Sequence, residues 1–103
     1  MITSITVDDA EMPLAEAESF TFFEAADDSG ALLRVSSSSL GKWTVERWAS
    51  KVRRWTPMGH VRRDENLFVA YASTLSDPDP LSSHKLLLDA VEAVGVDGPA
   101  GAS

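Results

Sequence analysis

Apolar and polar residues alternate in two runs on either side of the sequence DDSG, residues 27–30. A period of two predicts strands with one buried face, and Asp, Ser and Gly are typical turn residues, so residues 20–35 predict a β-hairpin. SITV, residues 4–7, predicts a further short strand. The serines at 36–39 predict a polar loop after the hairpin.

LFVAYAS, residues 67–73, is apolar on both alternating faces. This pattern is typical of a strand covered on both sides, so residues 67–72 predict a strand inside the sheet. The preceding TPMGHVRRDEN predicts a proline-initiated return, with an edge strand at residues 60–62.

The segment GKWTVERWASKVRRW, residues 41–55, fits the helical period better than the strand period. At about 100° per residue its apolar positions fall in one sector. With Thr44 as N-cap, this predicts a helix over residues 44–55. Trp43 then precedes the cap, where it packs on Trp48 as a hydrophobic staple or remains available to a partner.

A second helix is predicted over residues 81–94, capped near Asp79 or Ser82 and ended by Gly95. Together the elements predict an α+β fold, in which a mainly antiparallel sheet packs against two helices. One domain covers residues 1–95, and residues 96–103 form a disordered tail. The predicted core consists of Trp48, Val52, Trp55, Phe22, Leu33, Val69, Leu87 and Val91.

Charge is strongly segregated along the 103 residues, whose formal net charge is −7. Residues 42–63 contain seven basic residues and one acidic residue, Glu46, whereas residues 1–41 and 64–103 carry net charges of −7 and −6. A basic middle segment therefore lies between acidic flanks. It attracts either carboxylates, of the protein itself or of a partner, or nucleic-acid phosphates.

No sequence motif for catalysis or for a cofactor withstands a test of its spacing. There is no cysteine, which excludes disulfides and thiolate chemistry. Gly41 and Lys42 lack the remainder of a phosphate-binding loop, and Ser83 beside His84 lacks an orienting acid. We therefore expect a protein that is not an enzyme and that binds no metal or cofactor. Its short apolar runs predict a cytoplasmic protein with no membrane segment.

The order hairpin, tryptophan-containing segment, RRWTP, RRDENLFVAYA and SSHKLLLDAVEAV resembles YbjN-type domains, which share the fold of type III secretion chaperones. The resemblance covers about residues 20–95. It implies a small acidic α+β protein, often dimeric, that works by holding another protein. It implies no catalytic residues.

We therefore predict a non-catalytic protein-binding module, such as a chaperone-like, immunity or regulatory factor, that acts through a sheet edge or through the basic helix face. The alternative is a nucleic-acid-binding regulator that uses residues 42–63. The predicted partner-binding residues are Trp43, Arg47, Lys51, Arg54, Arg62 and Arg63.

Overall fold

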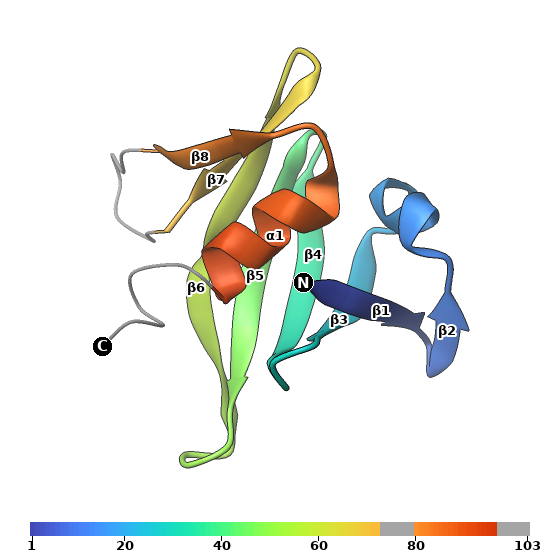
Figure 1. Cartoon of the computed structure of the whole chain (residues 1–103), viewed down its shortest axis with the longest axis vertical. Helices are drawn as coiled ribbons and strands as arrows, with labels where there is room; N and C mark the ends of the chain where they lie inside the picture. The colour runs from blue at the N-terminus through green and yellow to red at the C-terminus, as the bar shows by residue number, and fades with distance from the viewer. Residues whose placement is uncertain (73–79, 97–103) are drawn as a thin grey trace.

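Eight strands form one antiparallel sheet in the order β2-β1-β3-β4-β5-β6-β7-β8 (Figure 1). The computed structural model describes residues 1–72 and 80–96, so the predicted tail lies almost entirely outside the described residues. From β3 onward every strand pairs with its neighbour in the chain. The strands are β1 (Ile2–Val7), β2 (Ala10–Met12), β3 (Phe22–Asp27), β4 (Leu32–Ser39), β5 (Lys42–Ala49), β6 (Arg54–Asp64), β7 (Leu67–Tyr71) and β8 (Pro80–His84).

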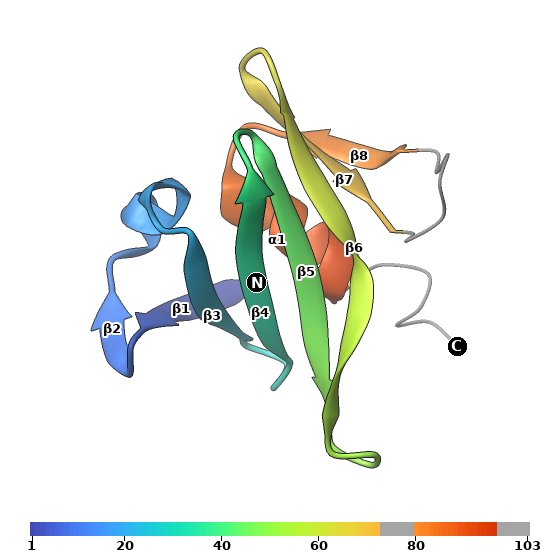
Figure 2. The same cartoon turned by 180° about the vertical axis from the view of Figure 1, so that it is seen from behind.

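Among the described residues one α-helix, α1 (Leu87–Gly95), packs on one face of this sheet, and a 3₁₀ helix, η1 (Leu14–Ser19), links β2 to β3. Figure 2 shows no helix on the opposite face of β4, β5 and β6, which we call the outer face. The prediction of a mainly antiparallel sheet with some helix is confirmed. The predicted cover of two helices is wrong, because α1 alone fills that role.

The predicted helix over residues 44–55 is wrong, since this segment forms β5, a turn at residues 50–53 and the start of β6. Trp48 and Trp55 lie directly opposite each other across the two strands. Trp43 and Val45 point toward α1 and are buried. The apolar residues that suggested one helical face are therefore divided between the two faces of a sheet.

The second predicted helix is right only in its C-terminal part. α1 begins at Leu87, and residues 80–84 instead form β8, which pairs with β7. The expected cap at Ser82 is thus wrong, and Asp79 lies outside the described residues. The serines at 36–39, predicted as a loop, continue β4 alongside β5. The predicted hairpin of residues 20–35 and the inner strand at 67–72 are confirmed as β3–β4 and β7.

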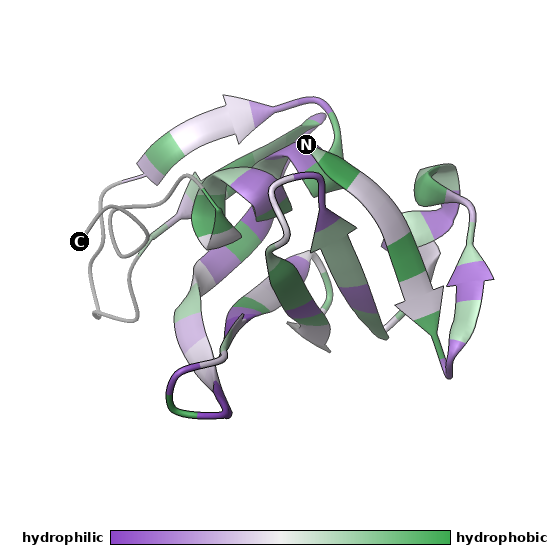
Figure 3. Cartoon of the chain, turned by 60° about the horizontal axis from the view of Figure 1, so that its bottom comes forward, coloured by the Kyte–Doolittle hydropathy of each residue, from purple (hydrophilic) through white to green (hydrophobic). Residues whose placement is uncertain are grey.

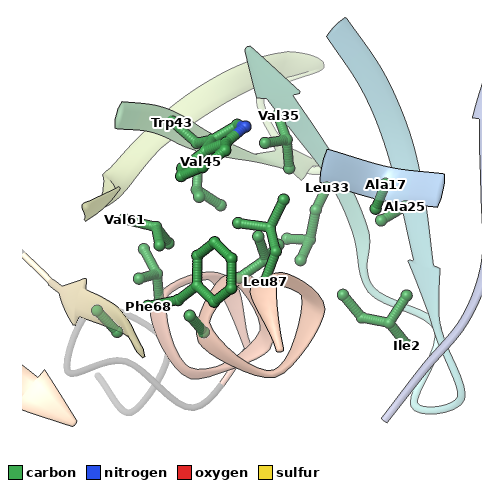
Figure 4. Close-up of a cluster of buried hydrophobic side chains, with 14 of the residues drawn as sticks. Ile2, Ala17, Ala25, Leu33, Val35, Trp43, Val45, Val61, Phe68 and Leu87 are labelled. Atoms are coloured by element: carbon green, nitrogen blue, oxygen red, sulfur yellow. The ribbon is translucent and has the colours of Figure 1, made fainter. Parts of the chain in front are cut away.

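The core fills the space between the sheet and α1 (Figure 4). Of the predicted core residues, four are buried: Leu33, Val69, Leu87 and Val91. Phe22, Trp48 and Val52 are instead 46%, 38% and 56% exposed. Their place is taken by apolar side chains that point inward from successive strands, namely Ile5, Phe23, Val35, Trp43, Val45, Val61 and Phe68.

A β-bulge bends β6 in its middle. Val45 lies opposite Gly59 and Glu46 opposite Pro57, which leaves Met58 as an extra, buried residue. A bulge also accommodates Pro57, which has no N–H for a regular ladder. β7 pairs only with residues 60–64 of β6, and β4 pairs with β5 only as far as Arg47, so the end of the β5–β6 hairpin, residues 48–55, projects beyond the sheet (Figure 1).

The amino terminus joins β1 to the β3–β4 turn and to α1. The Met1 ammonium lies 2.5 Å from Asp27 Oδ1 and 2.9 Å from Asp28 Oδ1, and it also contacts Glu92 of α1. Hydrogen bonds to Asp27, Glu92 and Asp28 raise the pKa of this ammonium from 8.0 to about 11. The ammonium and the Ser29 hydroxyl lower the pKa of the buried Asp27 carboxyl.

This cluster predicts two limits to stability. The ammonium has a raised pKa in the folded state, so its contribution is complete below about pH 8 and is lost as the pH rises toward about 11. Asp27 has a lowered pKa, so its contribution is present above its ordinary pKa of 3.8 and is lost below it. Urea unfolding across this pH range measures both limits.

Acetylation of the amino terminus provides the control, because it removes the ammonium charge. We expect the acetylated protein to be less stable at neutral pH and to lose less stability between pH 8 and pH 11. Equal alkaline losses in the two forms would contradict the assigned role of Met1.

Candidate binding surface on the β5–β6 hairpin

The fold divides the predicted partner-binding residues among four places. Trp43 is 6% exposed and packs edge-to-face on Phe68, with ring centroids 5.6 Å apart. Figure 4 shows it among the side chains of the core. A partner-binding role for Trp43 therefore does not fit its burial, and the predicted staple with Trp48 is wrong because the helix is absent.

Arg47 and Arg63 point to the same side of the sheet as α1 and have partners within the chain. Arg47 Nη1 donates to the carbonyl of Gly95 at 3.4 Å, where it meets the negative end of the helix dipole. Arg63 Nη1 lies 3.8 Å from Glu18 Oε1, and its guanidinium carbon lies 5.8 Å from the centre of the Phe68 ring. These two arginines therefore support the fold.

Lys51 and Arg54 lie at the projecting end of the hairpin, with Val52 and Arg53 between them. We call residues 51–54 the basic tip. All four are exposed, and the three cations form no ion pair with any carboxylate in the described part of the chain. Figure 3 shows the tip as one hydrophobic position flanked by hydrophilic ones. The expectation that Lys51 and Arg54 meet the protein's own acidic segments therefore finds no support among residues 1–72 and 80–96.

An aromatic cluster packs on the outer face of the hairpin, next to the basic tip. Trp48 and Trp55 pack edge-to-face with ring centroids 5.5 Å apart. The Arg34 guanidinium carbon lies 4.1 Å from the Trp55 ring centre and 5.8 Å from that of Phe22. Such pairs restrict side-chain and strand motion, so the cluster presents the tip on a stiff support.

Arg34 and Phe22 were missed by sequence reasoning. Arg34 lies opposite Glu24 on β3 and Glu46 on β5, yet it forms an ion pair with neither of them. Its stacking on Trp55 depends on a residue 21 positions away, which only the register of three strands brings close. The signal that could have located it was the strand alternation of residues 32–35, which places Leu33 inward and Arg34 outward.

A second cationic pair lies on the outer face at the other end of the hairpin. Lys42 and Arg62 are directly opposite each other on β5 and β6. Like charges in this arrangement repel and are destabilising. Neither has an ion-pair partner among the described carboxylates, so the pair attracts external anions.

The edge strand β8 places a serine and a histidine within hydrogen-bond distance. Ser82 Oγ and His84 Nε2 are 2.7 Å apart. In the described part of the chain, however, His84 has no carboxylate partner to orient its ring, which a nucleophile–base pair requires. The residues 1–72 and 80–96 also bring together no group of three or more metal-ligating side chains.

Comparisons with family models, curated proteins and solved structures found no match. None of the helices in the described part of the chain is long and apolar enough to cross a membrane.

Proposed function

We propose that the protein is a non-catalytic binding module whose basic tip docks on an acidic surface of a protein partner. The observation that carries the proposal is the group of exposed, unpaired cations around an exposed valine at the end of a projecting hairpin. Unpaired surface cations keep their long-range field, which accelerates encounter with an acidic partner.

Val52 favours a protein partner over a polyphosphate one. It is 56% exposed and lies between Lys51 and Arg53, so a docked surface must cover an apolar side chain as well as neutralise charge. Protein interfaces combine an apolar centre with a polar rim, whereas a phosphate backbone offers no apolar counterpart.

Affinity capture with the purified protein tests the proposal. We expect Lys51→Glu to remove partners that the wild-type protein retains from a lysate, because it reverses a charge at the centre of the contact. Lys85→Glu is the matched control, since Lys85 is also exposed, its replacement makes the same change in net charge, and it lies between β8 and α1, away from the hairpin. Capture that is unchanged by Lys51→Glu, or lost equally in both variants, would contradict the proposal.

A nucleic-acid-binding function is the second candidate, supported by the opposed cations Lys42 and Arg62 and by the aromatic cluster on the same face of the sheet. Base stacking and phosphate neutralisation together suit single-stranded nucleic acid. Fluorescence anisotropy with single-stranded and duplex oligonucleotides over a salt series tests it. Steeply salt-dependent binding that Arg62→Glu abolishes and Lys85→Glu leaves intact would favour this candidate.

A further inference from the structure

A pocket of about 330 Å³ opens between β1, η1 and the first turn of α1. Its lining is almost entirely apolar, with Glu18 and Asp89 as its only carboxylates. Met1, Leu14 and Leu86, which also line it, are exposed, so apolar surface surrounds the opening. The lining residues are Met1, Ile2, Leu14, Ala15, Ala17, Glu18, Leu86, Leu87, Leu88 and Asp89.

The surroundings of the pocket are acidic. Besides Glu18 and Asp89, the carboxylates of Asp27, Asp28 and Glu92 gather around the Met1 ammonium. The cations among and next to these described residues are that ammonium, Arg63, which faces Glu18, and Lys85, which directly precedes Leu86. Five carboxylates against three cations leave the site with a net negative charge.

We propose that this pocket receives the basic tip of a second copy of the chain. Val52 enters the apolar pocket while Lys51 and Arg53 meet the exposed carboxylates at its edge, those of Glu18, Asp28 and Asp89. The inference rests on the proposed function, because it identifies the acidic partner of the tip as another copy of the same protein.

Size and charge both match between tip and pocket. The pocket is larger than one valine side chain, so the aliphatic stems of the flanking Lys51 and Arg53 also find apolar cover. The tip is cationic within a chain of net charge −7, so the acidic side of another copy is its most abundant electrostatic complement.

The tip cannot reach the pocket of its own copy. In Figure 1 the β5–β6 hairpin projects at the bottom, whereas the pocket residues lie around the amino terminus, η1 and the start of α1. The contact is therefore between different surfaces of two copies. The assembly is either a closed two-fold dimer with two tip–pocket contacts or an open series of copies joined by one contact each.

Sedimentation velocity over a concentration series tests the self-association. We expect the average mass of the wild-type protein to rise with concentration and this rise to weaken with salt. Val52→Ser and Lys51→Glu at the tip should each raise the dissociation constant by about tenfold or more, because central contacts dominate interface energy. Ala15→Trp should have the same effect by filling the pocket. If the tryptophan at position 15 prevents folding, Leu14→Glu serves as the pocket variant in place of Ala15→Trp.

A mixing experiment tests whether the tip of one copy meets the pocket of another. Lys51→Glu has a damaged tip and an intact pocket, whereas Ala15→Trp has an intact tip and a filled pocket. An equimolar mixture should therefore form a mixed complex although neither variant associates alone. Leu40→Ser is the control, because Leu40 is fully exposed on the β4–β5 turn and lies outside both surfaces. It should leave self-association unchanged.

Three results would overturn the inference: a wild-type protein that stays monomeric, association unaffected by the tip and pocket variants, or association abolished by Leu40→Ser alone. A monomeric protein whose captured partners still disappear with Lys51→Glu would leave the proposed function standing and remove only self-docking. Unchanged capture together with tip-dependent self-association would contradict docking of the tip on a different protein and leave the second copy as the supported partner.

Discussion

Replacement of Trp43 by alanine is expected to lower the free energy of unfolding by about 3 to 5 kcal/mol. Trp43 is 6% exposed, and it fills the core between β5 and Phe68 of β7. Its removal leaves a cavity that neighbouring strands of a continuous sheet cannot close. Urea unfolding followed by circular dichroism measures the loss.

Trp48→Ala is the matched control, because the same side chain is removed from the outer face. Trp48 is 38% exposed and packs mainly on Trp55, so we expect a loss of only about 1 kcal/mol. The helical interpretation of residues 44–55 placed Trp48 in the core, and it would therefore require the larger loss, about 3 to 5 kcal/mol, for Trp48→Ala instead. A loss from Trp48→Ala that equals that from Trp43→Ala would contradict the assignment of the two faces.

Trp43→Phe separates packing from hydrogen bonding. The indole Nε1 is buried and has no hydrogen-bond partner among the described residues. Because an unpaired buried donor is itself costly, the loss of the N–H offsets part of the lost volume. We therefore expect Trp43→Phe to be much less destabilising than Trp43→Ala.

The second large effect is expected from Gly59→Ala, at about 2 to 6 kcal/mol. Gly59 has a φ angle of 150°, a conformation that costs other residues about 1 to 3 kcal/mol. A Cβ atom at this position would lie 2.0 Å from the carbonyl oxygen of Tyr71, so β6 and β7 would have to separate. Overpacking of this kind adds about 1 to 3 kcal/mol.

Gly30→Ala isolates the backbone contribution. Gly30 has a φ angle of 93°, but an added Cβ meets no atom within 4 Å. We expect a loss of about 1 to 3 kcal/mol from strain alone. Thermal or urea unfolding of both variants gives the comparison, and equal losses would show that the close approach of Tyr71 is relieved without cost.

Strands with a clear period of two were predictable from the sequence, whereas β5 was not. The β3–β4 hairpin carries the turn DDSG, and β7 is apolar on both faces. At the end of β5 the usual polarity of the two faces is reversed. The polar Arg47 points inward to the carbonyl of Gly95, whereas the apolar Trp48 points outward. The turn that follows, SKVR, contains no glycine, proline, asparagine or aspartate, so Ser50 alone indicated a turn there.

The basic character of the candidate surface was predictable, but its shape was not. Lys51 and Arg54 were identified from charge alone, and they do lie together at the tip. Arg47 and Arg63 instead point to the α1 side of the sheet, where they have partners within the chain. Which side they occupy depends on strand register. The pocket combines residues near positions 1, 15 and 87, and no local sequence pattern links them.

The order of the strands along the chain also determines the order in which the parts of the core can form during synthesis. From β3 to β8 each new strand adds to the one before it, so pairing proceeds locally and requires no long loop closure. The covering helix α1 comes after all of the strands. During synthesis, the inward side chains of β3 to β7 therefore stay uncovered until residues 87–95 leave the ribosome, and this interval is when the nascent chain is most exposed to aggregation.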